Sequence, residues 1–520
     1  GNKKKFGGKL TANTFGSKLL LEGPLSKNQK SSFVFSGKTS YLDKSSDIFY
    51  KEPLFTFDEN GLPYSYTDLY GKISLHGNNG SKFNIFGFNF QDLVDYENIS
   101  KLSWNSNGIG SEFILIPGNS PVLIEGNFAY SSYKISLDEA ASPLRESGIS
   151  GFNMGFDFTY FKPKSKIKYG FDVHGYATDF LTYNSVNTPI TQNENTSEFS
   201  GYINYQYTST RLIIEPGFRI QKYTLGLSPE PRLGIKYIVN EKTRLKLASG
   251  FYSQNILSTS SDRDVVNLFS GIISSPEEIP TQPNGDEYAS KIQKAKHIIT
   301  GIEFDVNNQI DFQVEAYIKD FNQLTNINRN MTSDDDDTFI IETGIARGID
   351  ALIKYNSKKL YVWLVYSLGQ VKRDDGVREY SPHFDRRHNV NFVTSYKFGK
   401  KQDWKFDARW NLGSGFPFTQ TQGFYENITF SDGINTDYTS TNGDLGIQYA
   451  ELNNGRLPYY HRLDISLAKN ITFKNNSKLN ITASVTNAYN RENIFYFNRV
   501  KYDRVNQLPL MPSLGMSLTF

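Results

Sequence analysis

Large apolar and polar residues alternate with a period of two along much of this 520-residue chain. Every second residue of 152–160 is large and apolar, and the same pattern resumes over 167–174 after a short polar turn. The segments 310–318 and 479–486 repeat it. Because successive side chains of a strand point to opposite faces of its sheet, the pattern predicts strands with one apolar face and one polar face.

The composition favours a sheet in a membrane barrel over a sheet in a soluble protein. Aromatic residues make up 15% of the chain, yet the mean hydropathy is −0.48. A membrane barrel needs both, because its lipid face and aromatic girdles are apolar while its lumen is wet. No apolar run approaches the ~18 residues that a membrane-spanning helix requires. A half-buried sheet in a soluble sandwich or propeller alternates in the same way, but no repeat of about 40 to 50 residues supports a propeller.

Short polar turns and long irregular segments separate the predicted strands. The short turns lie at 26–30, 77–81, 162–165, 240–243, 307–308, 356–358, 399–402 and 474–477. The long segments are 43–64, 254–293, 322–337 and 416–458. Turns on one side and loops on the other are typical of outer-membrane barrels, with turns in the periplasm and loops outside the cell. The pattern predicts an all-β fold, a transmembrane antiparallel β-barrel of about 22 strands, as one domain over 1–520 with no helix.

Charge and motifs exclude several functions. The formal net charge of +2 gives no reason to expect nucleic acid as a partner, and the absence of cysteine excludes disulfides and thiolate sites. No zincin motif, phosphate loop, dinucleotide fingerprint or nucleophile elbow is present. We therefore expect no enzymatic activity and no cofactor.

Several segments occur together in a recognisable order. They are 19–25 with 31–42, 228–234, 296–303, 384–388, 413–417, 457–464, 485–490 with Asn493, 512–515 and the terminal Phe520. In order and spacing they resemble the barrel of TonB-dependent outer-membrane receptors along essentially the whole chain. The resemblance implies a cell-outer-membrane channel that imports a scarce nutrient, with outer loops that select it and energy from the TonB complex.

Two parts of that family are missing from the sequence. Its members carry an N-terminal plug domain inside the barrel, preceded by a TonB box, and this chain has neither. We expect both to lie upstream in the full protein, so that the TonB energy-transducing complex acts through the plug. The alternative is a non-transporting scaffold, or a gated component, in a multiprotein outer-membrane complex. Lipid and lipopolysaccharide are further expected partners. The sequence does not decide whether a surface lipoprotein caps the barrel.

Two charged motifs invite a catalytic interpretation. Asp385, Arg386, Arg387 and His388 combine a carboxylate, two cations and a base within four residues. If they begin a strand, alternation places Asp385 and Arg387 on one face and the other two on the opposite face, which divides the cluster. We predict instead that these residues form ion pairs between strands at the membrane rim and anchor a long loop.

The second motif supports the same structural interpretation. His461, Arg462 and Asp464 are placed on the following strand, where pairing with the first cluster is predicted. The resemblance implies structural roles for further motif residues, which are Gly415, Pro417, Asn487, Asn490 and the terminal Phe520.

The run Asp334, Asp335, Asp336 and Asp337 offers hard oxygen ligands for a metal ion such as calcium. Adjacent carboxylates diverge, however, and the spaced pattern and glycine of a known calcium loop are absent. A solvated outer loop, or one that bridges to lipopolysaccharide, is the default interpretation.

The aromatic residues form two predicted groups. Those near strand ends are predicted to be girdle residues at the two membrane interfaces: Tyr396, Phe398, Tyr459, Tyr460, Phe495, Tyr496 and Phe497. Those in outer loops are candidates for stacking on a sugar or gripping a peptide: Phe416, Phe418, Phe424 and Tyr425. Neither group identifies the ligand.

Overall fold

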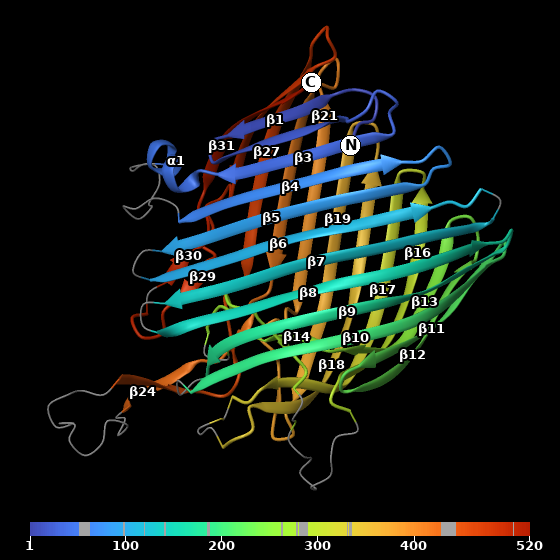
Figure 1. Ribbon diagram of the computed structural model, residues 1–520. Helices are drawn as coiled ribbons and strands as arrows, with labels where there is room; N and C mark the ends of the chain where they lie inside the picture. The colour runs from blue at the N-terminus through green and yellow to red at the C-terminus, as the bar shows by residue number, and fades with distance from the viewer. Residues whose placement is uncertain are drawn as a thin grey trace.

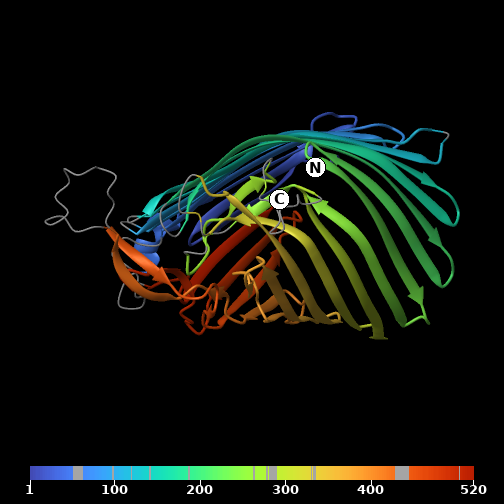
Figure 2. The ribbon, with the colours of Figure 1, turned by 90° about the horizontal axis from the view of Figure 1, so that it is seen from below.

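The computed structural model describes residues 1–50, 63–96, 99–118, 120–139, 142–184, 188–259, 261, 264–276, 279, 290–329, 331, 335–427, 444–502 and 504–520. Within these ranges, no helix has the length and apolar character needed to cross a membrane. The predicted fold class is confirmed, because 22 strands form one closed antiparallel barrel (Figures 1 and 2).

Chain order equals spatial order around the barrel. The first half contains β1 (Gly7–Asn13), β2 (Gly16–Pro24), β3 (Ser31–Ser40), β4 (Tyr64–His76), β5 (Lys82–Tyr96), β6 (Ser100–Leu115), β7 (Val122–Glu139), β8 (Ser142–Phe161), β9 (Ser165–Tyr183), β10 (Pro189–Thr208) and β11 (Leu212–Tyr223). The second half contains β12 (Gly226–Ile238), β13 (Thr243–Gln254), β16 (Gln293–Asn307), β17 (Ile310–Ile327), β18 (Phe339–Asn356), β19 (Leu360–Asp374), β21 (His388–Phe398), β22 (Trp404–Gly413), β27 (Tyr460–Thr472), β28 (Lys478–Thr486) and β31 (Met511–Thr519).

The last strand closes the barrel on the first, as the alternation at the chain end predicts. Leu10 of β1 lies opposite Leu19 of β2 on one side and Leu518 of β31 on the other. Just beyond β31, the backbone N–H of Phe520 donates to the Gly8 carbonyl, and Gly8 donates to Phe520 in return, both at 3.0 Å. Closure leaves no free sheet edge, whose N–H and carbonyl groups would find no hydrogen-bond partner in lipid.

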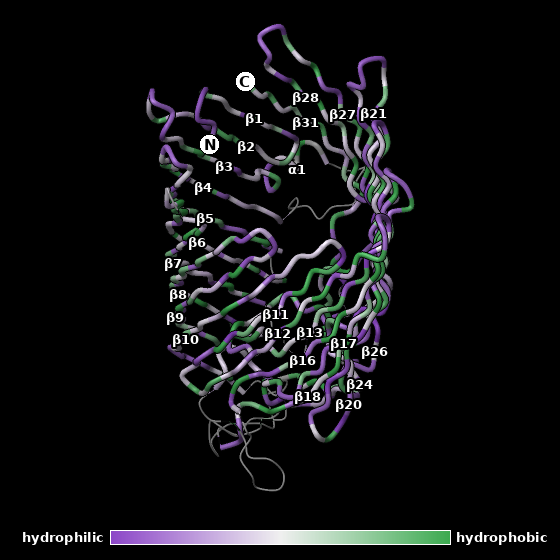
Figure 3. Tube along the Cα trace, turned by 90° about the vertical axis from the view of Figure 1, so that its right-hand side faces the viewer, coloured by the Kyte–Doolittle hydropathy of each residue, from purple (hydrophilic) through white to green (hydrophobic). Residues whose placement is uncertain are grey.

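The two faces of the wall have opposite chemistry, and hydropathy alternates along the strands in Figure 3. Exposed Leu247 and Ile302 belong to the outward face. On the inward face of the same strands, Lys246 of β13 forms ion pairs with Glu303 at 2.9 Å and with Glu315 at 2.8 Å. This division suits lipid outside and water inside.

The two ends of the barrel differ as the turn pattern predicts. All of the predicted short turns join strands at one end, and the long segments lie at the other, which we call the mouth. Two predictions were wrong in detail. The segment 322–337 is not all loop, because β17 continues to Ile327. A helix is present, α1 (Leu42–Phe49), seated by the buried side chains of Leu42 and Tyr50 against Met511.

Further short strands lie outside the barrel wall. They are β14 (Ile256–Thr259) with β15 (Gly271–Ser274), β20 (Glu379–Tyr380), β23 (Pro417–Phe418) with β26 (Gly455–Arg456), β24 (Thr421–Asn427) with β25 (Asp444–Tyr449), and β29 (Ile494–Phe497) with β30 (Arg504–Asn506). Apart from β20, which extends the edge of β19, they form hairpin-like pairs within the loops of the mouth.

The assignment of faces predicts unequal effects of arginine at two adjacent positions of β13. Leu247→Arg places a cation in lipid and is expected to lower the free energy of unfolding by about 2–4 kcal/mol. Ala248→Arg places the same cation in the lumen, where we expect almost no change. Urea unfolding of barrels refolded into liposomes measures both. Equal destabilisation by the two variants would contradict the assignment.

Candidate functional site

The mouth is the candidate site, because loops from around the barrel converge there. The hairpin formed by β14 and β15 contacts the inner wall at β8, β9 and β10, and Figure 2 shows light-green segments of this region within the ring of strands. The loop between β13 and β16 thus folds inward rather than standing in solvent.

An apolar core holds this hairpin against the wall. Ile273 of β15 is fully buried, with 0% of its surface exposed, and it belongs to the same cluster as Phe180, Leu137 and Ile190 of the wall. Gly271 allows close approach, because an added Cβ would lie 2.1 Å from the Phe180 ring. Burial of several large side chains at roughly 25 cal/mol per Å² makes this contact a permanent part of the fold.

Side chains of the wall also satisfy the backbone of the hairpin. The Gln192 amide donates to the Ser274 carbonyl at 3.0 Å, and its oxygen accepts the Ser274 N–H at 2.9 Å. The Ile272 N–H donates to Ser147 Oγ at 2.8 Å. β15 has no strand partner on this side, and buried backbone N–H and carbonyl groups need hydrogen bonds. The side chains of the wall supply them.

Arg145 carries the charge of this buried region. Only 1% of the residue is exposed, and its guanidinium pairs with Glu139 at 2.5 Å and with Asp264 of the inward-folded loop at 2.8 Å. Glu139 also accepts a 3.0 Å hydrogen bond from Tyr496 of β29. Unpaired buried charges are costly, so these pairs stabilise the packed loops. Through Asp264 and Tyr496, Arg145 and Glu139 tie two separate loops to β7 and β8.

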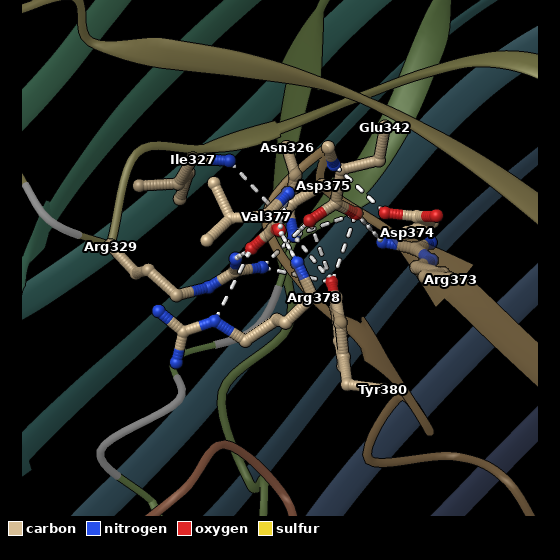
Figure 4. Close-up of polar contacts among 11 residues, drawn as sticks. Asn326, Ile327, Arg329, Glu342, Arg373, Asp374, Asp375, Val377, Arg378 and Tyr380 are labelled. Atoms are coloured by element: carbon tan, nitrogen blue, oxygen red, sulfur yellow. Dashed lines mark hydrogen bonds and ion pairs between the residues drawn. The ribbon is translucent and has the colours of Figure 1, made fainter.

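A second network joins loops on the opposite wall (Figure 4). The buried Glu342 carboxylate of β18 accepts from Arg329 Nη2 and from the Tyr380 hydroxyl, both at 2.7 Å. The other arm of Arg329 pairs with Asp375 at 2.7 Å. Burial and the Glu342 carboxylate raise the pKa of Tyr380, so this hydroxyl stays a donor. The network ties the β17–β18 loop to the β19–β21 loop.

The motif that begins at Asp385 forms a third tie. Asp385 has no exposed surface; it accepts the Val371 N–H at 2.8 Å and pairs with Arg456 at 2.6 Å and with Arg387 at 3.6 Å. Residues 385–387 precede β21, which begins at His388, so strict alternation does not apply to these three residues. The predicted anchoring of a long loop fits these contacts, since Arg456 belongs to the loop between β22 and β27.

Arg386 turns away from this ion pair and packs on Phe416, with the guanidinium carbon 4.0 Å from the ring centroid. Gly413 lies against the same guanidinium, where an added Cβ would be 2.5 Å away. Phe416 is therefore engaged by Arg386, and the predicted stacking of Phe416 on a ligand would have to displace that cation.

The second charged motif makes different contacts from those predicted. Arg462 pairs with Asp464 on its own strand at 2.9 Å, and Asp464 accepts the Asn487 N–H at 3.0 Å. Both motifs are fully described, and no ion pair joins them, because β22 lies between β21 and β27. His388 and His461 instead lie on the outward face and bond to Tyr366 at 2.9 Å and Tyr489 at 2.8 Å.

The remaining motif residues shape loop ends. Asn487 and Asn490 adopt left-handed backbones, with φ of 53° and 52°, and the Asn490 side chain accepts the Leu510 N–H at 2.8 Å. Gly415 cannot carry a side chain, since a Cβ would lie 1.6 Å from the Leu457 carbonyl oxygen. Pro417 pairs with Arg456 in the β23–β26 ladder.

The loop aromatics divide into engaged and exposed residues. Phe418 is half-buried, 6.0 Å from the Arg499 guanidinium. Phe424 and Tyr425 of β24 remain 38% and 43% exposed and stay candidates for ligand contact. The girdle prediction was wrong for two residues, because Phe495 packs on the core of the mouth and Tyr496 bonds to Glu139 there.

The acidic run is described in part, over residues 335–337. Asp334 lies outside the described residues, and the Asp337 carbonyl accepts from the Asn328 amide at 2.6 Å. Within the described ranges, no group of three or more histidine or acidic side chains is arranged to hold a metal ion. Metal binding by this run stays a prediction.

Three cations central to the mouth were not predicted: Arg145, Arg329 and Arg456. Glu139 lies only six positions before Arg145, but other acidic partners lie far away in sequence; Asp264, for example, follows Arg145 by 119 positions. No local spacing signals such pairs.

Comparisons with known proteins support the fold. No protein-family model and no curated protein sequence matches the chain. FpvA of Pseudomonas aeruginosa, solved with heterologous pyoverdines, is 11% identical with a TM-score of 0.68, covering 99% of this chain and 72% of FpvA. The FrpB iron transporter of Neisseria meningitidis is 11% identical with a TM-score of 0.68, covering 99% and 82%. The alcaligin outer-membrane receptor FauA of Bordetella pertussis is 9% identical with a TM-score of 0.63, covering 99% and 76%.

The buried tie predicts that the inward-folded hairpin opens when Arg145 is removed. Arg145→Gln leaves Glu139 and Asp264 without their cation, a loss of about 3–5 kcal/mol. We expect amide exchange of residues 272–274 to accelerate by roughly a hundredfold or more. Lys134→Gln is the control on the same two strands, since its half-exposed pair with Glu146 contributes about 0–1 kcal/mol. Equal exchange in both variants would contradict the assignment.

A pH dependence is predicted for the β19–β21 loop. Burial, together with the nearby Arg373, lowers the pKa of His383 from 6.5 to about 4. The packed loop therefore excludes a proton that the open loop accepts, so its stability is fully present above pH 6.5, falls as the pH drops towards 4, and then levels off. Hydrogen exchange of residues 380–384, corrected for intrinsic rates, measures this at pH 7.5 and 4.5. His383→Asn should abolish the difference; an unchanged difference would exclude His383 as its source.

Proposed function

We propose that this chain is the barrel of a TonB-dependent receptor that imports a scarce nutrient across the outer membrane. The observation that carries the proposal is a closed barrel of 22 strands with loop segments packed against the inner wall of its mouth. A barrel of this size encloses a wide lumen that is usually plugged.

The lumen chemistry suits a hydrated passage. On the inner wall of β12, β13 and β16, Glu303 pairs with Lys236 at 2.8 Å, with Arg244 at 2.9 Å and with Lys246 at 2.9 Å. Paired charges facing the lumen stay hydrated and leave few uncompensated sites that would trap a passing solute. The plug would gate this passage and engage the TonB complex, whereas the barrel supplies walls and selective loops.

The structural neighbours suggest which cargo to test first. FrpB is an iron transporter and FauA an alcaligin receptor, so iron chelates head the list for this chain. An oligosaccharide, a peptide and a vitamin follow, because Phe424 and Tyr425 are equally suited to stacking on a sugar or an apolar side chain. No enzymatic step is proposed.

Deletion of the gene tests the import proposal. We expect growth to fail on one limiting nutrient, to be restored by the full-length protein, and to fail equally when TonB is deleted. Growth unchanged on every ferric chelate, vitamin, oligosaccharide and peptide, together with copurification in fixed ratio with other envelope proteins, would contradict import. That result would favour the scaffold.

A further inference from the structure

The turns at the end of the barrel opposite the mouth, which faces the periplasm, are rich in basic residues. Two lysines each occur in the turns 25–30, 162–164, 357–359 and 399–403, and one basic residue each occurs in 209–211, 239–242 and 473–477. The acidic residues of the turns at this end are Glu241 and Asp403. Asp403 pairs with Lys469 of β27, and among the described residues the basic residues of the turns form no ion pair. The turns therefore carry a net positive charge.

A groove of about 720 Å³ lies at this end, bordered by the turns 25–30 and 77–81. Four side chains form its apolar wall: Leu75 of β4, Phe83 of β5, and Phe113 and Leu115 of β6. Leu75 lies opposite Phe83, which lies opposite Phe113, so the wall is continuous across three strands. Leu75, Phe83 and Leu115 are exposed, and each is the outward residue nearest this end of its strand. The groove therefore lies where the lipid-facing surface meets the periplasm.

Two lysines supply the charge of the groove. Lys30 is exposed and Lys82 is half-buried, and both line the groove. Among the described residues neither lysine forms an ion pair, and the residues that line the groove include no acidic one. An anion that enters the groove therefore meets two cations and no carboxylate.

Hydrogen bonds fix the turns that border the groove. The Lys30 carbonyl accepts the His76 N–H at 2.8 Å, which joins the turn 25–30 to the end of β4. The Ser81 hydroxyl accepts the Ile116 N–H at 3.0 Å, and the Asn79 amide donates to the Ile116 carbonyl at 2.7 Å. Because the backbone around the groove is already ordered, a ligand that binds there has to order little besides the two lysine side chains.

We propose that the groove binds an anionic phospholipid of the periplasmic leaflet, with its phosphate at Lys30 and Lys82 and an acyl chain against the apolar wall. The ligand has to combine an anionic headgroup with a hydrocarbon chain, because the two cations stand beside side chains that face lipid. A periplasmic protein has no access to that wall, since membrane hydrocarbon covers it. Phosphatidylglycerol and cardiolipin fit better than phosphatidylethanolamine, whose ammonium group finds no carboxylate in the groove. The inference requires the outer-membrane location of the barrel but not import.

Lipid binding by the full-length protein tests the inference. Delipidated protein in detergent would be titrated with phosphatidylglycerol and, separately, with phosphatidylethanolamine of the same acyl chains, and bound lipid would be counted by native mass spectrometry. We expect phosphatidylglycerol to bind about threefold more strongly or better, and the double variant Lys30→Gln/Lys82→Gln to lower its affinity by about threefold or more. Equal affinity for the two lipids would overturn the proposal.

The matched control removes the same charge from another turn at the same end. Lys162→Gln/Lys164→Gln replaces two exposed lysines that do not line the groove, and it should leave the affinity for phosphatidylglycerol nearly unchanged. Equal losses in the two double variants would show diffuse attraction to the basic turns and refute a site in the groove. Displacement of phosphatidylglycerol by millimolar inorganic phosphate would show a free-phosphate site and refute the lipid assignment. Heat-modifiable gel migration confirms that each variant is folded, and no result depends on a transported substrate.

Discussion

Closure of the sheet is the constraint on which the rest of the structure depends. In hydrocarbon no water can satisfy a free N–H or carbonyl group, so every wall strand needs a partner on both sides. The pairing of β31 with β1 meets this requirement with the last residues of the chain. Once the ring is closed, the register fixes which side chains meet lipid and which meet the lumen, and a shift of one residue would exchange the two faces.

The mouth follows from unequal strand lengths. β8 and β10 each contain 20 residues, and they rise into a tall wall whose inner surface is apolar near its top. The hairpin of β14 and β15 covers that surface. β21 and β22 are much shorter, with 11 and 10 residues, and long loops complete their side of the mouth. Arg145 ties a loop to the tall wall, whereas the Asp385–Arg456 ion pair ties loops together at the short one.

Local pattern was enough to predict the strands, their antiparallel order and the two unequal ends. A period of two is written into each strand, and consecutive strands of such a barrel pair with one another. The interior of the mouth was not predictable in the same way. Phe495 and Tyr496 belong to an aromatic segment near a strand end, which is typical of girdle residues. The path of the chain after Asn487 instead places both of them inside the mouth. α1 was missed because a helix of eight residues held by Leu42 and Tyr50 leaves almost no periodic signal.

The motifs that carry the family resemblance explain architecture and say little about cargo. Asp385 is buried beneath Arg456 and Asn487 closes a loop end, so these two side chains have their hydrogen-bonding capacity satisfied within the protein, while Arg386 is packed on Phe416. A group that recognises a ligand must keep some of that capacity for the ligand. Selectivity is therefore expected from uncommitted surfaces such as the exposed β24 aromatics Phe424 and Tyr425, which are not among the loop anchors. Under the proposed import function, the loop anchors therefore fix the frame and leave the choice of nutrient to these exposed surfaces.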